Sequence, residues 1–153
     1  MSVYLLALLI GVVAGLRAMT APAAISWAAH LGWLDLSQSW LAFLGYRWTP
    51  WVFTALAAME LVTDQLPSTP SRKVPQQFGA RIVMGALCGA AIGTSVAMPL
   101  VGGIFGVVGA IIGTLGGAAA RGRVASLFGR DWPAAVIEDA VAIGGAWAIV
   151  SAL

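Results

Sequence analysis

The sequence predicts an all-α fold, a polytopic bundle of transmembrane helices in which residues 1–153 form a single domain. Residues 82–120 contain no charged side chain, although a helix needs only about 20 residues to cross a bilayer core. The chain is 60% hydrophobic and 9% charged, whereas a soluble domain carries about 25% charged residues. Residues 82–120 are therefore expected to cross a membrane twice.

Charged residues and helix breakers divide the chain into five or six membrane segments. The expected segments are residues 3–16, 18–34, 48–64, the two halves of residues 82–120, and residues 133–153. Pro99 and the pair Gly102-Gly103 are expected to separate the two halves, and Thr20-Ala21-Pro22 to interrupt the first pair of segments. That first pair forms two short crossings, one broken crossing plus an interfacial helix, or a re-entrant hairpin.

The positions of lysine and arginine predict the orientation of the chain in the membrane. The loops at residues 65–79 and 121–133 share one side of the membrane, whether the first pair of segments crosses once or twice. Both loops are rich in basic residues, so the positive-inside rule places them in the cytoplasm. The opposite side carries an aromatic belt that includes Trp40, Tyr46 and Trp48.

Glycines spaced four residues apart predict close helix packing, either within the chain or in a homo-oligomer. The pairs are Gly11 with Gly15, Gly85 with Gly89, and Gly109 with Gly113. A shift of the sequence by 74 positions favours a three-plus-three inverted repeat, although the abundance of glycine and alanine alone could produce it. The matched positions are Gly11 with Gly85, Gly15 with Gly89, Thr20 with Thr94, Arg47 with Arg121, and Asp64 with Glu138.

Ionisable side chains are expected to form one layer near the cytoplasmic face of the bundle. Its members are Arg17, Glu60, Asp64, Arg81, Arg121, Glu138 and Asp139. A lone charge in hydrocarbon costs at least about 2.5–3.5 kcal/mol, so these groups pair with one another or line a polar cavity. Glu60 and Asp64 share a helix face and are expected to point into the bundle, within pairing distance of an arginine. The layer is either a set of interhelical salt bridges or a binding site.

The connection between the third and fourth segments is a second candidate site. Its three prolines predict a stiff, extended link over residues 65–77. Hydroxyl groups and cations in this link are of the kind that binds phosphate or carboxylate, and they equally suit a cytoplasmic loop beside anionic lipids. The residues are Ser68, Thr69, Ser71, Arg72 and Lys73.

Other classes of function lack support in the sequence. His30 is the one histidine, Cys88 is the one cysteine within an apolar segment, and no glycine-rich phosphate loop or cluster of metal ligands is present. Basic residues are scattered over several loops and form no nucleic-acid face. We therefore expect no enzymatic activity, no cofactor, no bound metal and no nucleic-acid partner.

Four stretches of the sequence together resemble a domain-of-unknown-function family of small bacterial integral membrane proteins, number four-one-two-six. They are Gly15-Leu16-Arg17-Ala18-Met19-Thr20-Ala21-Pro22, Glu60-Leu61-Val62-Thr63-Asp64, Pro67-Ser68-Thr69-Pro70-Ser71-Arg72, and Glu138-Asp139. The resemblance covers essentially the whole chain and implies a helical membrane protein, without implying an activity.

The predicted function is that of a small inner-membrane protein that binds or transports a small polar or ionic solute at the charged layer. Its expected partners are this solute and the membrane lipids. The alternatives are binding of a lipid headgroup or lipid translocation, and a structural role as a membrane subunit without transport. A carboxylate whose proton affinity is raised by burial would suit proton coupling.

The predicted orientation can be tested with single cysteines at Ser71 and Ser126 in a variant that lacks Cys88. Because both positions lie in the basic loops, membrane-impermeant thiol reagents added to intact cells should leave both cysteines unmodified. Rapid labelling of both from outside would contradict the orientation.

Overall fold

The computed structural model of the chain describes residues 2–65 and 74–153, and these ranges contain six α-helices and one short 3-10 helix. The elements are α1 Val3–Leu16, α2 Thr20–His30, η1 Ala42–Gly45, α3 Thr49–Thr63, α4 Pro75–Thr94, α5 Pro99–Phe128 and α6 Asp131–Val150. The all-α prediction is therefore confirmed. By length and composition, α5 and α6 are long and apolar enough to cross a membrane, while α1 and α3 are shorter apolar helices.

Prolines mark the beginning of three helices. Pro50, Pro75 and Pro99 lie in the first turns of α3, α4 and α5, where a residue without an N–H costs no helical hydrogen bond. The predicted break at Pro99 is confirmed, because α4 ends at Thr94 and α5 begins at Pro99. The expectation that Gly102-Gly103 also breaks the chain is wrong, since both glycines lie inside α5.

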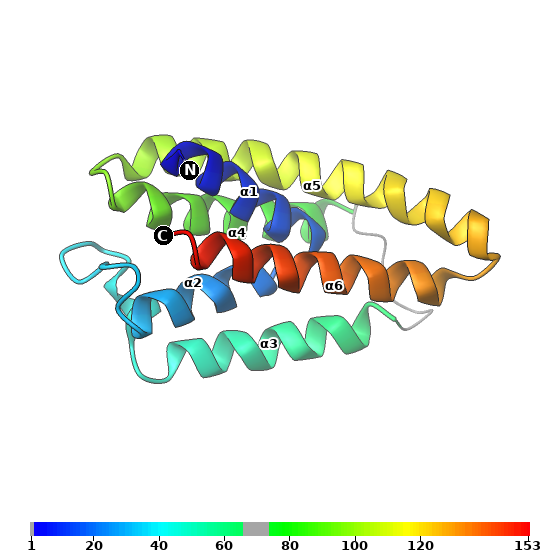
Figure 1. Cartoon of the computed structure of the whole chain (residues 1–153), viewed down its shortest axis with the longest axis horizontal. Helices are drawn as coiled ribbons and strands as arrows, with labels where there is room; N and C mark the ends of the chain where they lie inside the picture. Colours follow the sequence, from blue (N-terminus) through cyan, green and yellow to red (C-terminus); the bar gives the residue numbers. More distant parts are fainter. Residues whose placement is uncertain (1, 66–73) are drawn as a thin grey trace.

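The first pair of segments forms a helical hairpin whose turn comprises residues 17–19. In Figure 1, α1 runs away from the N-terminus and α2 returns, so that the last turn of α2 lies at the same end of the molecule as the N-terminus. The expected interruption at Thr20-Ala21-Pro22 is wrong by a few residues. These residues form the first turn of α2, where backbone N–H groups have no partner within the helix and a proline fits.

Glycines bring α1, α4 and α5 into close contact. A Cβ atom at Gly106 of α5 would lie 2.0 Å from the carbonyl oxygen of Gly85 on α4, and one at Gly109 would lie 2.0 Å from that of Leu8 on α1. Gly11 in turn faces the backbone of Gly106. The spaced glycines thus lie at contacts between helices of this chain, as small residues do where backbones approach closely.

The helix boundaries do not follow the predicted inverted repeat. Thr20 begins α2, whereas its partner under the 74-residue shift, Thr94, ends α4. The same shift places α3 on residues 123–137, which include the turn between α5 and α6. A three-plus-three repeat in this register is therefore wrong beyond the first helix: α1 shifts onto residues 77–90 within α4, but α2 shifts onto residues 94–104, across the break between α4 and α5.

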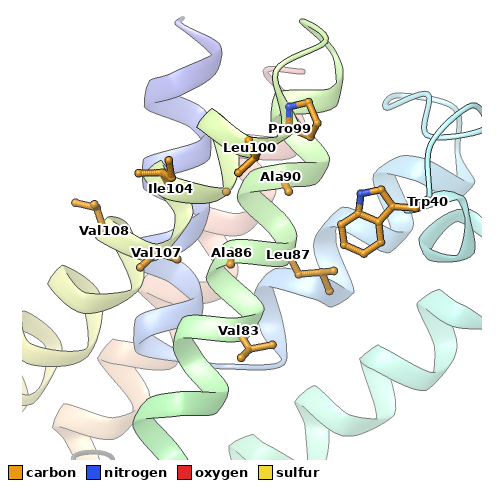
Figure 2. Close-up of a pocket in the computed structure, with 11 residues that line it drawn as sticks. Trp40, Val83, Ala86, Leu87, Ala90, Pro99, Leu100, Ile104, Val107 and Val108 are labelled. Atoms are coloured by element: carbon orange, nitrogen blue, oxygen red, sulfur yellow. The ribbon is translucent and has the colours of Figure 1, made fainter.

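The outer surface of the bundle is apolar over much of its area. Leu100 of α5 is 80% exposed and Trp147 of α6 is 63% exposed. A surface groove of about 740 Å³ follows α4 and α5 and is lined by side chains such as Leu87 and Ile104. Figure 2 shows these side chains together with Trp40, which comes from the connection after α2. Large apolar side chains therefore face outward along the longest helices.

The glycine contacts predict that Gly106→Ala destabilises the bundle. The added methyl group would overlap the backbone of α4, and such overpacking costs typically about 1–3 kcal/mol. The control is Gly116→Ala in the same helix, where a Cβ meets nothing within 4 Å, so that only the better helix propensity of alanine remains. Thermal unfolding in detergent should show a lower Tm for Gly106→Ala alone. Equal Tm values for both variants would contradict the packing.

Candidate functional site

The site is built around the turn between α1 and α2, where helix-end backbone groups lie inside the bundle. Arg81 of α4 is 1% exposed, and its Nη1 donates hydrogen bonds to the carbonyl oxygens of Gly15 at 2.9 Å and Leu16 at 2.6 Å. The hydroxyl of Thr114 on α5 donates to the Gly15 carbonyl at 3.2 Å. Because these carbonyls form the negative end of the α1 dipole, the guanidinium of Arg81 stabilises that helix end.

A carboxylate binds the other side of the same turn. The two carboxylate oxygens of Glu60 on α3 accept hydrogen bonds from the backbone N–H groups of Ala18 and Met19, each at 2.8 Å. These N–H groups precede the first turn of α2, which is the positive end of its dipole. The α2 helix has no side-chain cap of its own, so Glu60 supplies the cap from a different helix.

Arg17 lies at the tip of the turn and is fully buried, with 0% exposure. Its Nε donates a hydrogen bond to Asp139 Oδ1 of α6 at 2.7 Å, and its Nη1 forms an ion pair with Asp64 at the end of α3. Arg81 Nη2 lies 3.6 Å from Glu60 Oε1 and 3.8 Å from Asp64 Oδ2. We refer to these five residues, Arg17, Glu60, Asp64, Arg81 and Asp139, as the central cluster.

A second ionic group lies between α5 and α6. Arg121 Nε donates to Asp131 Oδ1 at 2.9 Å, and Arg121 Nη1 lies 3.5 Å from Glu138 Oε2. Glu138 and Asp139 therefore face different arginines, as adjacent helical residues that diverge by about 100° should. The sequence analysis omitted Asp131, although an acidic residue in the first turn of a helix is a recognisable signal.

The structure brings the seven predicted ionisable residues into two neighbouring groups that share α6. The expectation that Glu60 and Asp64 point inward and lie within pairing distance of an arginine is confirmed. The predicted anion-binding residues Ser68, Thr69, Ser71, Arg72 and Lys73 lie outside the described residues. In the described part of the chain, no three His, Cys, Asp or Glu side chains are arranged to hold a metal ion.

The composition of the central cluster determines what it can bind. Two guanidinium groups face three carboxylates, so the described residues of the cluster carry one negative charge in excess. The backbone N–H groups that precede α2 offset part of the carboxylate charge of Glu60, and the backbone C=O groups at the end of α1 offset part of the guanidinium charge of Arg81. In a site of low dielectric constant, an excess carboxylate charge attracts a cation or a proton.

The pairing of Arg17 predicts that Arg17→Gln is strongly destabilising. The substitution leaves Asp139 without its guanidinium partner and Asp64 with the more distant Arg81 alone, and the loss of one member of a buried ion pair costs about 3–5 kcal/mol. Arg123→Gln, at an exposed position of α5, is the matched control and should change stability by less than about 0.5 kcal/mol. Equilibrium unfolding in detergent checks both variants, and similar small losses would show that Arg17 does not hold the turn.

Comparisons with known proteins identify the family. The chain matches no curated protein and no solved structure. The model of a family described as a domain of unknown function, DUF4126, matches residues 4–152, a range that contains the hairpin turn and all five residues of the central cluster. The chain therefore belongs to the DUF4126 family, as its motifs predicted.

Proposed function

We propose that this protein is embedded in the bacterial inner membrane and binds or transports a small polar or ionic solute at the central cluster. The excess of carboxylates favours a cation as the solute. The segments at residues 65–79 and 121–133 face the cytoplasm in this proposal. They are not entirely loops as expected, because residues 75–79 lie in α4, 121–128 in α5 and 131–133 in α6. In support, the last turn of α3, the first turn of α4 and the turn between α5 and α6 lie at one end of the molecule (Figure 1).

The distribution of side chains supports the membrane location. Charged side chains such as Arg17 and Arg81 are buried, whereas apolar side chains such as Leu100 and Trp147 are exposed. A soluble protein rarely exposes large contiguous apolar patches. The length and composition of α5 and α6 agree with two crossings, and the remaining helices then pack beside them.

The observation that supports the proposed activity is the α1–α2 hairpin, whose turn is bound by charged side chains from three other helices. The turn between α1 and α2 exposes backbone carbonyl and N–H groups inside the bundle, and α3, α4 and α6 each direct ionisable groups at it. Membrane transporters build solute sites from helix ends that lie inside the membrane, which they obtain from discontinuous helices, whereas here the helix ends belong to a hairpin. Ionisable residues within a membrane also mark ion or proton pathways by default.

A structural role is the second candidate, and the number of ion pairs and hydrogen bonds around the hairpin turn favours it. Arg17 is fully buried and contacts two carboxylates, while Glu60 engages two backbone N–H groups. A network of this kind could serve to hold the hairpin in place. The transport function and the structural role predict different effects of replacing a carboxylate by its amide on uptake and on stability. The amide keeps the shape of the side chain and loses its charge.

The variants Asp64→Asn and Asp139→Asn separate these functions. Proton or sodium uptake into proteoliposomes under an imposed potential should fall to the rate of protein-free vesicles. The loss of stability in detergent should stay well below about 3 kcal/mol, because each variant leaves Arg17 one carboxylate partner. The control is Asp35→Asn in an exposed loop, which should keep the parental rate. Hydrogen bonds from the side chain and backbone N–H of Ser37 lower the pKa of Asp35, so this control also removes a charged carboxylate.

Two results would contradict the transport proposal. Parental uptake by both amide variants would show that the cluster carboxylates do not take part. A loss of stability of about 3–5 kcal/mol in both variants, the size expected for a broken buried ion pair, would instead favour the structural role.

A further inference from the structure

A second groove opens between α2, α3 and α6, and its lining residues include chain neighbours of the hairpin turn and of Glu60 in the central cluster. It encloses about 430 Å³, which lies within the range of about 300–1,000 Å³ for small-molecule sites. Alanines form much of its wall, with Ala24 and Ala28 on α2 and Ala57 and Ala58 on α3. Because the alanine side chains are short, they leave an apolar groove between the helices unfilled.

The position of α3 keeps this groove open. The α3 helix packs against α2 and η1, and Pro50 is its one buried residue. Its other end is tied to the hairpin turn by the carboxylates of Glu60 and Asp64. The wall opposite α3 is formed by α6, with Ile143 and Trp147 among its lining residues. The groove therefore has fixed ends and an apolar middle.

The two ends of the groove differ in chemistry. Trp33 and Trp147 stack edge to face at one end, with ring centroids 6.0 Å apart. At the other end lie Leu61, which follows Glu60 in the chain, and Thr20, which follows the Met19 N–H that Glu60 binds. The groove thus runs from an aromatic, apolar end to a polar end beside the cluster carboxylates.

One polar group at the inner end lacks a partner. The Thr20 hydroxyl is buried, with the residue 7% exposed, and its Oγ1 has no hydrogen-bond partner among the described residues. The other hydroxyl in the groove, Thr54, accepts a hydrogen bond from Trp27 Nε1 at 3.0 Å and donates to the Pro50 carbonyl at 2.7 Å. Buried hydroxyl groups are normally hydrogen-bonded. Of the two threonine hydroxyls in the groove, that of Thr20 is therefore the one available to a ligand.

We propose that this groove binds an amphiphile with one apolar chain and a cationic amine head. The chain lies along the alanines toward Trp33 and Trp147, and the head hydrogen-bonds to the Thr20 hydroxyl beside Glu60. The excess carboxylate charge of the cluster selects an amine over an anionic head. This inference rests on the proposed function for the membrane location and for the negative charge of the cluster, and it adds a ligand site beside the cluster.

Quenching of tryptophan fluorescence by brominated chains tests the proposal, because three tryptophans line the groove. Dodecylamine, dodecanol and dodecanoate, each brominated at the chain end, are titrated into the protein in phosphatidylcholine nanodiscs. The amine should saturate at the lowest concentration and the carboxylate at the highest. Equal or tighter binding of dodecanoate would overturn the assignment of a cationic head.

Three variants locate the binding site. Ala57→Leu fills the groove and should weaken amine binding by about tenfold or more, a change of at least about 1.4 kcal/mol. Ala55→Leu in the same helix lies at an exposed position and should bind as the parent does. Thr20→Val keeps the shape of the side chain and removes the hydroxyl, so it should weaken binding of the amine more than binding of 1-bromododecane, a further probe that has the brominated chain and no polar head. Unchanged quenching in Ala57→Leu would overturn the proposal.

The binding and uptake experiments distinguish failure of the groove inference from failure of the proposed function. If no probe binds in the groove while Asp64→Asn still abolishes cation uptake, the groove inference is overturned and the proposed function stands. If the amine binds and Ala57→Leu prevents it, the groove inference is supported, even where the uptake assay shows that Asp64 does not serve transport.

Discussion

The placement of the α1–α2 turn inside the bundle depends on charges that come from three other helices. Arg81 binds the carbonyl end of α1, Glu60 binds the N–H end of α2, and Arg17 between them binds Asp64 and Asp139. Each contact matches a charge to the opposite end of a helix dipole or to an opposite charge. Without these contacts, the unpaired backbone groups of the turn would be buried at a cost of several kcal/mol.

The same contacts position the rest of the molecule. Glycine packing fixes α1, α4 and α5 as one close unit, but α3 is almost unburied and is tied to this unit through its carboxylates and through α2. Asp139 likewise ties α6 to the turn. The groove between α3 and α6 follows from this arrangement, because helices held at their ends by ion pairs do not need to pack along their length.

Physical patterns in the sequence predicted the helices and the pairing of charges, while tertiary geometry decided the rest. The break between two helices at Pro99 was predicted correctly. Because Glu138 and Asp139 are adjacent in one helix, the sequence also predicted that their side chains point in different directions. The hairpin turn fell at Arg17 rather than at Pro22, because a proline is equally suited to the first turn of a helix. Contacts of a side chain with distant backbone, such as that of Arg81 with Leu16, have no local signal in the sequence.

A double-mutant cycle between Arg17 and Asp64 tests the central claim most directly. The free energies of unfolding in detergent are measured for the parent, Arg17→Gln, Asp64→Asn and the double variant. Because the two side chains form a buried ion pair, their coupling energy should exceed about 1 kcal/mol, within the range for residues in direct contact. If the loss of stability in the double variant equals the sum of the two single losses within about 0.5 kcal/mol, the account is contradicted.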